Sequence, residues 1–303
     1  MYKKIALIFL SIACNAQAFC DNFFRTEWRF SVGPAWHSFL SYEEFNLASP
    51  SLEPTVLSTE LIALAPEFMP YVEGRLRCYI NDCVNITLLA AGTGGPRGRS
   101  EVDGFIEAAP DILVKGRREA LTQINIAVVD LAMGAICKTP FSNVRINPSF
   151  GYVLNIEKLI LSALSDATHK LLFHNQWFGG YVGVEIDWQL LDCISVRPMY
   201  KAIFGQVDSL LIAQLPADEL AIYPDTARSF RYAPILGNIF AIDALYRTSF
   251  GHIGVNCSIQ QYKNTCPGNV ILGPQEPVIV NSASMTRLMY NQINLAFFAE
   301  VVF

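Results

Sequence analysis

Few side chains in this sequence could act in catalysis, and their spacing does not bring them together. The four histidines are His37, His169, His174 and His252. General-base or nucleophilic catalysis needs a basic group within hydrogen-bonding reach of a hydroxyl or carboxyl group. His37 is followed directly by Ser38, and adjacent residues of an extended strand point to opposite faces. We therefore predict no catalytic residue and no cofactor, and we expect that the chain is not an enzyme.

Cysteines are more numerous than histidines, and their spacing favours disulfide bonds over a metal site. A structural zinc site usually contains two cysteines separated by two other residues (C-x-x-C), or a histidine pair beside a cysteine pair. Neither pattern occurs here. We therefore predict no metal ion. Two pairs of cysteines are close in the sequence, and each could close a short loop. These candidate disulfides are Cys78–Cys83 and Cys257–Cys266.

Charged side chains recur at every second position within apolar segments, a pattern that predicts strands with one polar and one apolar face. Between residues 67 and 80, for example, Val72 and Leu76 share one parity, and Glu73 and Arg75 share the other. If the polar faces enclose a wet lumen, their charges would decide which small solutes pass. The charged residues that we expect on the inward face are Glu27, Arg29, Glu73, Arg75, Arg77, Arg145, Glu185, Asp187, Arg197, Lys201 and Glu300.

Ten segments alternate in this way, and we expect each to form a β-strand. They are Arg25–His37, Glu67–Ile80, Val84–Ala90, Leu121–Ile136, Asn143–Ile156, Phe178–Leu190, Ile194–Gly205, Phe230–Ile242, Tyr246–Gln260 and Thr286–Phe303. Short connections alternate with long ones, as in bacterial barrels with short periplasmic turns and longer outer loops. The sequence therefore predicts an all-β fold, an antiparallel transmembrane β-barrel of about ten strands with both termini in the periplasm. Residues 38–66 or 206–229 could hold further strands, which gives twelve as the alternative.

Two segments allow a second interpretation. Leu121–Ile136 changes parity near Asp130, which indicates a β-bulge that turns this carboxylate inward, with a core helix as the alternative. Residues 158–173 carry apolar side chains at helical spacing and could form a small helix outside the barrel.

The composition is typical of a membrane protein that lacks membrane-spanning helices. The chain is 52% hydrophobic and only 16% charged, whereas about 25% of the residues of a typical globular domain are charged. Beyond residue 18, no uncharged apolar run reaches the roughly 18 residues that indicate a transmembrane helix. A closed barrel is the other structure that satisfies all backbone polar groups within lipid.

The segment Met1–Ala18 has the features of a secretory signal peptide. Lys3 and Lys4 precede an apolar stretch, and residues 16–18 form an A-x-A cleavage site. We predict cleavage near Ala18 and one barrel domain over residues 19–303, with lipoprotein processing at Cys14 as the alternative. Cleavage removes one of the eight cysteines, so at least one thiol would stay free or pair between molecules. It also changes the formal net charge from −5 to −7, because both lysines are lost, which argues against nucleic acid as a partner.

The C-terminal strand carries a second recognisable pattern. Alternate positions from Ile293 to the last residue are apolar, and the strand ends on an aromatic side chain. This ending resembles the C-terminal strand of Gram-negative outer-membrane β-barrel proteins. The resemblance implies location in the outer membrane, contact with its lipids, and recognition by the barrel-assembly machinery through Phe297, Val301 and Phe303. The alternative is the buried last strand of a secreted, soluble β-sandwich.

The cysteine content is similar to that of the chlamydial and legionella-type major outer-membrane porins. This similarity implies a porin-like protein that could form disulfide-linked or non-covalent oligomers. We therefore expect a narrow channel for small hydrophilic solutes. The alternative is a plugged barrel that works as a surface adhesin or structural protein through its long outer loops.

Omptin proteases are ten-stranded barrels of similar length, and they use a pair of aspartates and an Asp-x-His element in the outer half of the barrel. This sequence has Glu185-Ile186-Asp187, but it contains neither an Asp-x-Asp nor an Asp-x-His pattern. The departure from the omptin pattern is a second reason to expect no enzymatic activity.

Overall fold

The computed structural model describes residues 24–49, 52–64, 69–80, 83–95, 98–109, 112–163, 170–214, 227–265, 268–272 and 280–303. The predicted signal peptide, Cys20, His169 and Cys266 lie outside the described residues. Within these ranges, no helix is long and apolar enough to cross a membrane.

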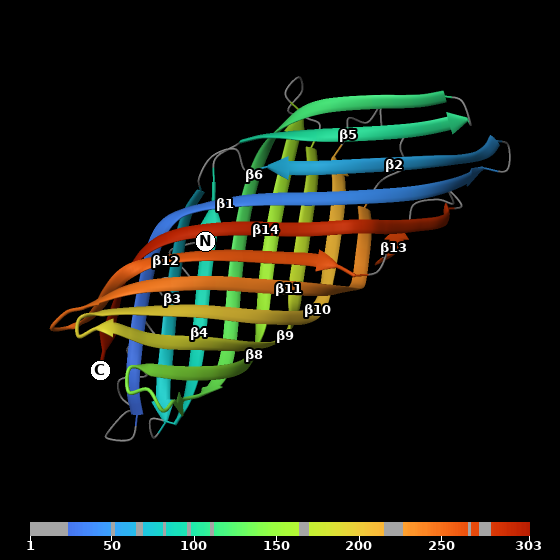
Figure 1. Cartoon of the computed structure of the whole chain (residues 1–303). Helices are drawn as coiled ribbons and strands as arrows, with labels where there is room; N and C mark the ends of the chain where they lie inside the picture. The colour runs from blue at the N-terminus through green and yellow to red at the C-terminus, as the bar shows by residue number, and fades with distance from the viewer. Residues whose placement is uncertain are drawn as a thin grey trace.

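The described chain forms a closed antiparallel β-barrel of ten strands, with further strands added at its two ends (Figure 1). The strands are β1 (Phe24–Ser49), β2 (Leu52–Leu64), β3 (Met69–Ile80), β4 (Val84–Gly94), β5 (Gly98–Ala109), β6 (Ile112–Ala135), β7 (Cys137–Lys138), β8 (Val144–Ala163), β9 (Lys170–Leu191), β10 (Ile194–Gln214), β11 (Ala227–Arg247), β12 (Gly251–Asn264), β13 (Gly268–Leu272) and β14 (Val280–Val302). The barrel closes where β1 pairs with β14, and Trp28 lies opposite Val301 in this seam. The predicted fold class and strand number are confirmed.

Both ends of the described chain lie at the same end of the barrel, together with the short turns. Thr26 and Phe303 exchange two backbone hydrogen bonds of 3.1 and 2.9 Å there. We call this the periplasmic end, and the opposite one the outer end. One predicted turn is misplaced, because β11 continues through residues 243–245 to Arg247 before the chain turns back. The glycine at the start of the next strand, Gly251, has a φ of 147°, which few other residues adopt.

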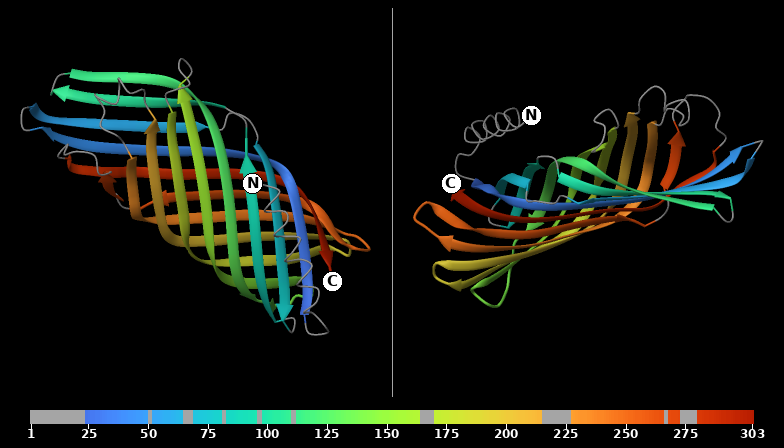
Figure 2. Two further views of the ribbon diagram at one scale, coloured as in Figure 1. Left: turned by 180° about the vertical axis from the view of Figure 1, so that it is seen from behind. Right: turned by 90° about the horizontal axis from the view of Figure 1, so that it is seen from above.

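At the outer end, strands occupy most of what the sequence suggested were long loops. The upper part of β1 pairs with β2, and β2 pairs with β5, which pairs in turn with β6. Figure 2 shows the β1–β2 and β5–β6 hairpins extending beyond the other strands of the barrel. The helix suggested for residues 158–173 does not form in the described part of that segment, because β8 runs to Ala163 and β9 begins at Lys170.

The outer surface of the barrel carries a belt of exposed, large apolar side chains. On β9, for example, Val182, Trp188 and Leu190 are exposed, whereas Trp177 and Tyr181 on the other parity are buried. Apolar surface on this scale is unusual for a soluble monomer. The other members of the belt include Phe30, Trp36, Val72, Leu131, Phe150, Tyr152, Tyr200, Phe204, Phe240, Ile242, Tyr246, Ile253, Ile293, Leu295 and Phe297.

The predicted bulge in β6 is wrong, although Asp130 does point inward. Ile124, Ile126, Val128 and Asp130 are all buried on one parity of a continuous strand. The pairings of β6 with β4 and β8 show no register shift. The prediction failed because the outer half of the interior is apolar, so that hydrophobicity does not mark the lipid-facing side there.

The predicted disulfide between Cys78 and Cys83 does not form in the structure. Cys78 lies within β3 opposite Ile86, whereas Cys83 lies in the turn and donates its backbone N–H to Ile80. The two residues therefore stand at different levels of the β3–β4 hairpin. Cys83 and Cys257 are free thiols, and the second predicted disulfide involves Cys266, which is outside the described residues.

The β1–β14 seam depends on a glycine. A Cβ atom added to Gly33 would lie 1.9 Å from the backbone oxygen of Leu295 and 2.6 Å from the Cα of Ala296. No side chain fits at such a distance, so a glycine is required at this point of the seam.

Candidate functional site

Ion pairs fill the periplasmic half of the barrel interior. We call this group the ion-pair layer, and it consists of Arg29, Glu73, Arg75, Arg77, Asp130, Glu185, Asp187, Arg197, Lys201, Asp243 and Glu300. Nine of them are among the residues that the sequence predicts for the inward face. Their predicted role, selecting the solutes that pass, stays a prediction.

The pair between Arg77 and Glu185 has the most regular geometry in the ion-pair layer. Nη1 and Nη2 of Arg77 donate to the two carboxylate oxygens of Glu185, at 2.8 Å each. The side chains come from β3 and β9, on different walls of the barrel, and both are about nine-tenths buried. Two parallel charge-assisted hydrogen bonds of this kind are strong and fix the orientation of both groups.

A second set of pairs crosses the interior close to the first. Arg29 on β1 is bound to Asp243 on β11, and its Nε lies 3.8 Å from Glu73. Asn256 donates a hydrogen bond of 2.6 Å to Asp243. Sequence reasoning missed Asp243, because it placed a turn there. Residues 239–242 are all apolar, so the sequence shows no alternation there that could be continued to Asp243.

Lys201 and Asp130 form the upper boundary of the ion-pair layer. The ammonium group of Lys201 is bound to Asp130, and it also donates to the hydroxyl of Tyr181 at 3.0 Å. Tyr181 donates in turn to Asp130 at 2.6 Å. A cavity of only about 30 Å³ lies among these residues and their neighbours, room for about one water molecule.

The outer half of the interior is filled by apolar and aromatic side chains, which we call the outer core. Its larger members are Phe39, Ile124, Ile126, Val128, Leu159, Phe173, Trp177, Ile203, Ile235, Tyr262, Leu288 and Tyr290. The rings of Trp177, Tyr262 and Tyr290 pack against one another, with centroids 5.3–5.9 Å apart. Such tilted contacts are the favoured geometry between aromatic rings.

One imidazole–carboxylate pair is enclosed by the outer core. His37 Nε2 lies 2.5 Å from Glu157 Oε1, and neither side chain is exposed at all. Asn175 donates to the other oxygen of Glu157 at 2.9 Å, and Ser209 donates to Asn175 at 2.5 Å. Among the described residues, nothing hydrogen-bonds the second ring nitrogen, Nδ1, of His37. No pattern in the sequence indicates this pair, because His37 and Glu157 lie on β1 and β8, far apart in the chain.

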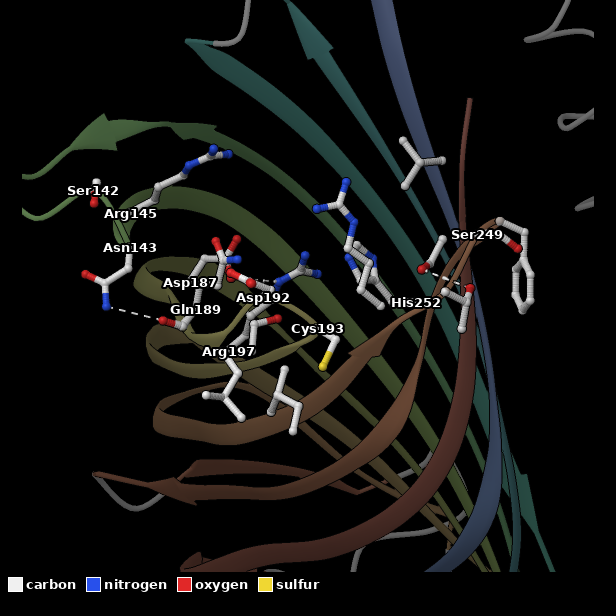
Figure 3. Close-up of a pocket in the computed structure, with 18 of the residues that line it drawn as sticks. Ser142, Asn143, Arg145, Asp187, Gln189, Asp192, Cys193, Arg197, Ser249 and His252 are labelled. Atoms are coloured by element: carbon white, nitrogen blue, oxygen red, sulfur yellow. Dashed lines mark hydrogen bonds and ion pairs between the residues drawn. The ribbon is translucent and has the colours of Figure 1, made fainter.

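The periplasmic mouth of the barrel contains a polar cavity of about 480 Å³. Figure 3 shows Arg145 and His252 on opposite sides of it, with Asp187 and Arg197 between them. Arg197 is held by Glu300 at 3.2 Å and Asp187 at 3.5 Å, and His252 contacts the same Glu300 at 2.9 Å. Three of the residues predicted for solute selection, Arg145, Asp187 and Arg197, therefore line this cavity, at the mouth rather than in the middle of the barrel.

Among the described residues, no group of three or more histidine, cysteine, aspartate or glutamate side chains is placed to hold a metal ion.

Comparisons with known proteins identify the class of fold. No protein-family model and no curated protein matches the sequence. The outer membrane protease OmpT from Escherichia coli is similar in structure, with a TM-score of 0.65 and 14% identity over 92% of this chain and 97% of that one. The outer membrane protein OprG from Pseudomonas aeruginosa matches with a TM-score of 0.34 and 9% identity, over 89% of this chain and 95% of that one. The similarity to OmpT shows that the chain has the fold of a Gram-negative outer-membrane β-barrel.

These comparisons correct two expectations. The prediction that the chain is not an enzyme, which was based on histidine spacing and on the missing omptin motifs, is contradicted by the structural similarity to an outer membrane protease. An identity of 14% shows the fold alone, so the comparison does not transfer a reaction or a substrate. The predicted similarity to chlamydial and legionella-type porins, which was based on cysteine content, finds no support.

Proposed function

We propose that this protein is an outer-membrane β-barrel that is closed to hydrophilic solutes and acts at its outer end. The sequence led us to expect a narrow channel, with a plugged barrel as the alternative. The proposal adopts the plugged barrel. The belt of exposed apolar side chains and the likeness to an outer-membrane barrel support a location in the outer membrane.

One observation carries the proposal: side chains that point into the barrel are inaccessible to water. Glu157, Asn175, Trp177, Tyr290 and Asn294 have 0% exposed surface. Residues that line an open aqueous channel would be exposed to the water inside it, as in barrels of about sixteen strands. In this smaller barrel the side chains themselves occupy the lumen.

The outer end offers the more extended surface for a function in contact with the surroundings of the cell. The two hairpins β1–β2 and β5–β6 extend beyond the other strands and form a platform at that end. Connections that a rigid barrel holds at a surface are common sites of binding. We infer that the hairpins present a surface to a partner outside the cell.

Conductance of the refolded protein in a planar bilayer tests whether the lumen is closed. We expect no discrete current steps from the native chain, with a known porin refolded in the same way as the positive control. Steps of constant size, changed in amplitude or ion selectivity by Arg77→Ala, would support the channel and contradict the proposal.

Peptide hydrolysis at the outer end is a second candidate function. It is favoured by the fold shared with a protease and by the pair of His37 and Glu157, since a carboxylate can orient an imidazole to act as a general base. Both side chains are buried, so this reaction requires the outer core to open toward the substrate. Cleavage of fluorogenic peptides by intact cells that display the protein, lost in His37→Asn and kept in His252→Asn, would establish this function.

A further inference from the structure

We propose that the cavity at the periplasmic mouth binds a small soluble oxyanion that carries at least two acid groups. The cavity is formed by the ends of β1, β8, β9, β10, β11 and β12 and by the turns between them. This inference does not depend on the proposed function at the outer end.

The charge of the cavity is the first argument. Four arginines, Arg25, Arg145, Arg197 and Arg247, line it, but only two aspartates, Asp187 and Asp192. Glu27 and Glu300 balance the charges of Arg25 and Arg197, so the positive charge that remains for a ligand is that of Arg145 and Arg247. Guanidinium groups exposed in a concave site attract anionic ligands from solution.

The second argument is that two of these arginines have no partner. Arg25 is paired with Glu27 at 2.8 Å, and Arg197 is paired with Glu300 and Asp187. Within the part of the chain that the structure describes, Arg145 and Arg247 make no side-chain hydrogen bond or ion pair, although both line the cavity. Asp187 lies opposite Arg145 in the β8–β9 register but is bound by Arg197 instead.

The shape of the cavity is the third argument. A volume of about 480 Å³ is within the range of small-molecule sites, roughly 300–1,000 Å³. Its floor is Arg197, which is buried and fixed by Glu300, so a ligand that enters from the periplasm stops there. Asn143, Gln189 and Ser249 add neutral hydrogen-bonding groups around the wall (Figure 3).

These features define the ligand by its chemistry. Guanidinium groups bind carboxylate and phosphate oxygens with paired N–H donors, and two unpaired arginines can each take one acid group. A monoanion would leave one arginine unsatisfied, and a neutral sugar would satisfy neither. Carboxylate and phosphate ligands share this chemistry, and the experiment must distinguish them.

The test is isothermal titration calorimetry on the full mature chain, refolded in non-ionic detergent at low ionic strength. The probes are citrate, which carries only carboxylates, and inorganic pyrophosphate, which carries only phosphates. We expect saturable binding of one or both, at least tenfold tighter than that of acetate, and weakened by added salt.

Three single variants and one double variant locate the binding. Arg145→Gln and Arg247→Gln should each weaken binding about tenfold, and the double variant should abolish it. Lys138→Gln removes a positive charge at the same end, from an exposed residue outside the cavity, and should leave binding unchanged. Because Arg145 and Arg247 are exposed, the variants should fold, and heat-modifiable migration on gels identifies the folded fraction that is titrated.

Each outcome bears on the proposal. Loss of binding in the two arginine variants but not in Lys138→Gln supports the site, and the stronger of the two probes gives the class of acid group. Binding that is equal in all three variants, or no binding of either probe at millimolar concentration, would overturn it. Neither result depends on whether the lumen conducts, so failure of this inference and failure of the proposed function are separate observations.

Discussion

The periplasmic half of the lumen is filled by paired charges, whereas the outer half is filled by aromatic and aliphatic side chains around a single imidazole–carboxylate pair. In the first region, arginines reach carboxylates on other walls, as Arg77 reaches Glu185 at 2.8 Å, or on their own strand, as Arg75 reaches Glu73 at 3.2 Å. In the second region, rings such as those of Trp177 and Tyr290 meet in van der Waals contact. Tyr181 belongs to both, because its ring packs in the outer core and its hydroxyl binds Asp130.

The two regions show that one lumen can be closed by two kinds of interaction, charge pairing and apolar packing. A buried charge depends on one specific partner, and removal of that partner leaves an uncompensated charge. A packed core depends on volume, and removal of a side chain leaves a cavity. The two regions should therefore respond differently to substitution, and the variants below test this difference.

Truncation of the outer core at its largest side chain should have the greatest effect. Trp177 is completely buried and packs against Tyr262 and Tyr290. We expect Trp177→Ala to lower the free energy of unfolding by about 4 kcal/mol, because it removes a large apolar side chain and leaves a cavity. Urea titration of the protein in lipid vesicles, followed by heat-modifiable migration on gels, measures this change.

Trp188 provides a matched control on the same strand. Its side chain points out of the barrel and is 48% exposed, so Trp188→Ala removes the same group without opening the interior. We expect a loss well below that of Trp177→Ala. Equal losses in the two variants would mean that the outer core is not packed as described.

Removal of one partner from the ion-pair layer should have the next largest effect. Arg77→Met keeps much of the side-chain volume but leaves the carboxylate of Glu185 buried without its bidentate partner. We expect the free energy of unfolding to fall by about 3 kcal/mol at neutral pH. The same urea titration measures the loss.

A double variant distinguishes charge from packing in this layer. In Arg77→Met combined with Glu185→Gln, no charge remains unpaired, so most of the lost stability should return. At Trp177, no second substitution of this kind should restore the lost stability, because the loss there comes from a cavity and not from an unpaired charge. If the double variant were as unstable as the sum of its two single variants, the pairing of Arg77 with Glu185 would not stabilise the barrel.

The seam that closes both regions should be sensitive to a single methyl group. We expect Gly33→Ala to cost about 2 kcal/mol, because the new Cβ would overlap the backbone of β14 and force the first and last strands apart. The comparison is Gly180→Ala, where the nearest atom would be 3.8 Å away. That variant should be neutral or slightly stabilising, since alanine loses less conformational entropy than glycine on folding.

Sequence periodicity predicted the barrel better than it predicted the interior. The alternation of apolar and polar residues located the ten strands, because one face of each strand meets lipid and the other does not. It failed on β6, where Val128 and Asp130 both point inward, since the outer core is as apolar as the lipid-facing surface.

Contacts across the barrel could not be predicted from the sequence. His37 meets Glu157, and Arg29 meets Asp243, only because the closed barrel places opposite walls within reach of long side chains. Which pairs meet depends on the register between the strands, and periodicity predicted the number of strands but not their register. The same reason explains why the sequence could not show that most of the predicted inward charges are paired with one another.

The smallest effect on stability should come from the last residue of the chain. The side chain of Phe303 is 64% exposed, and both of its backbone hydrogen bonds to Thr26 are independent of the ring. Phe303→Ala should therefore change the free energy of unfolding by less than about 1 kcal/mol in vitro.

If the barrel-assembly machinery recognises this residue, as the resemblance of the C-terminal strand predicts, the same variant should accumulate far less folded protein in the outer membrane of cells. Quantitative blotting of membrane fractions measures that yield, with Tyr246→Ala, an exposed aromatic residue at the same end on β11, as the control. Equal cellular yields for the two variants would mean that Phe303 is only part of the lipid-facing belt, whereas a loss confined to Phe303→Ala would separate assembly from stability.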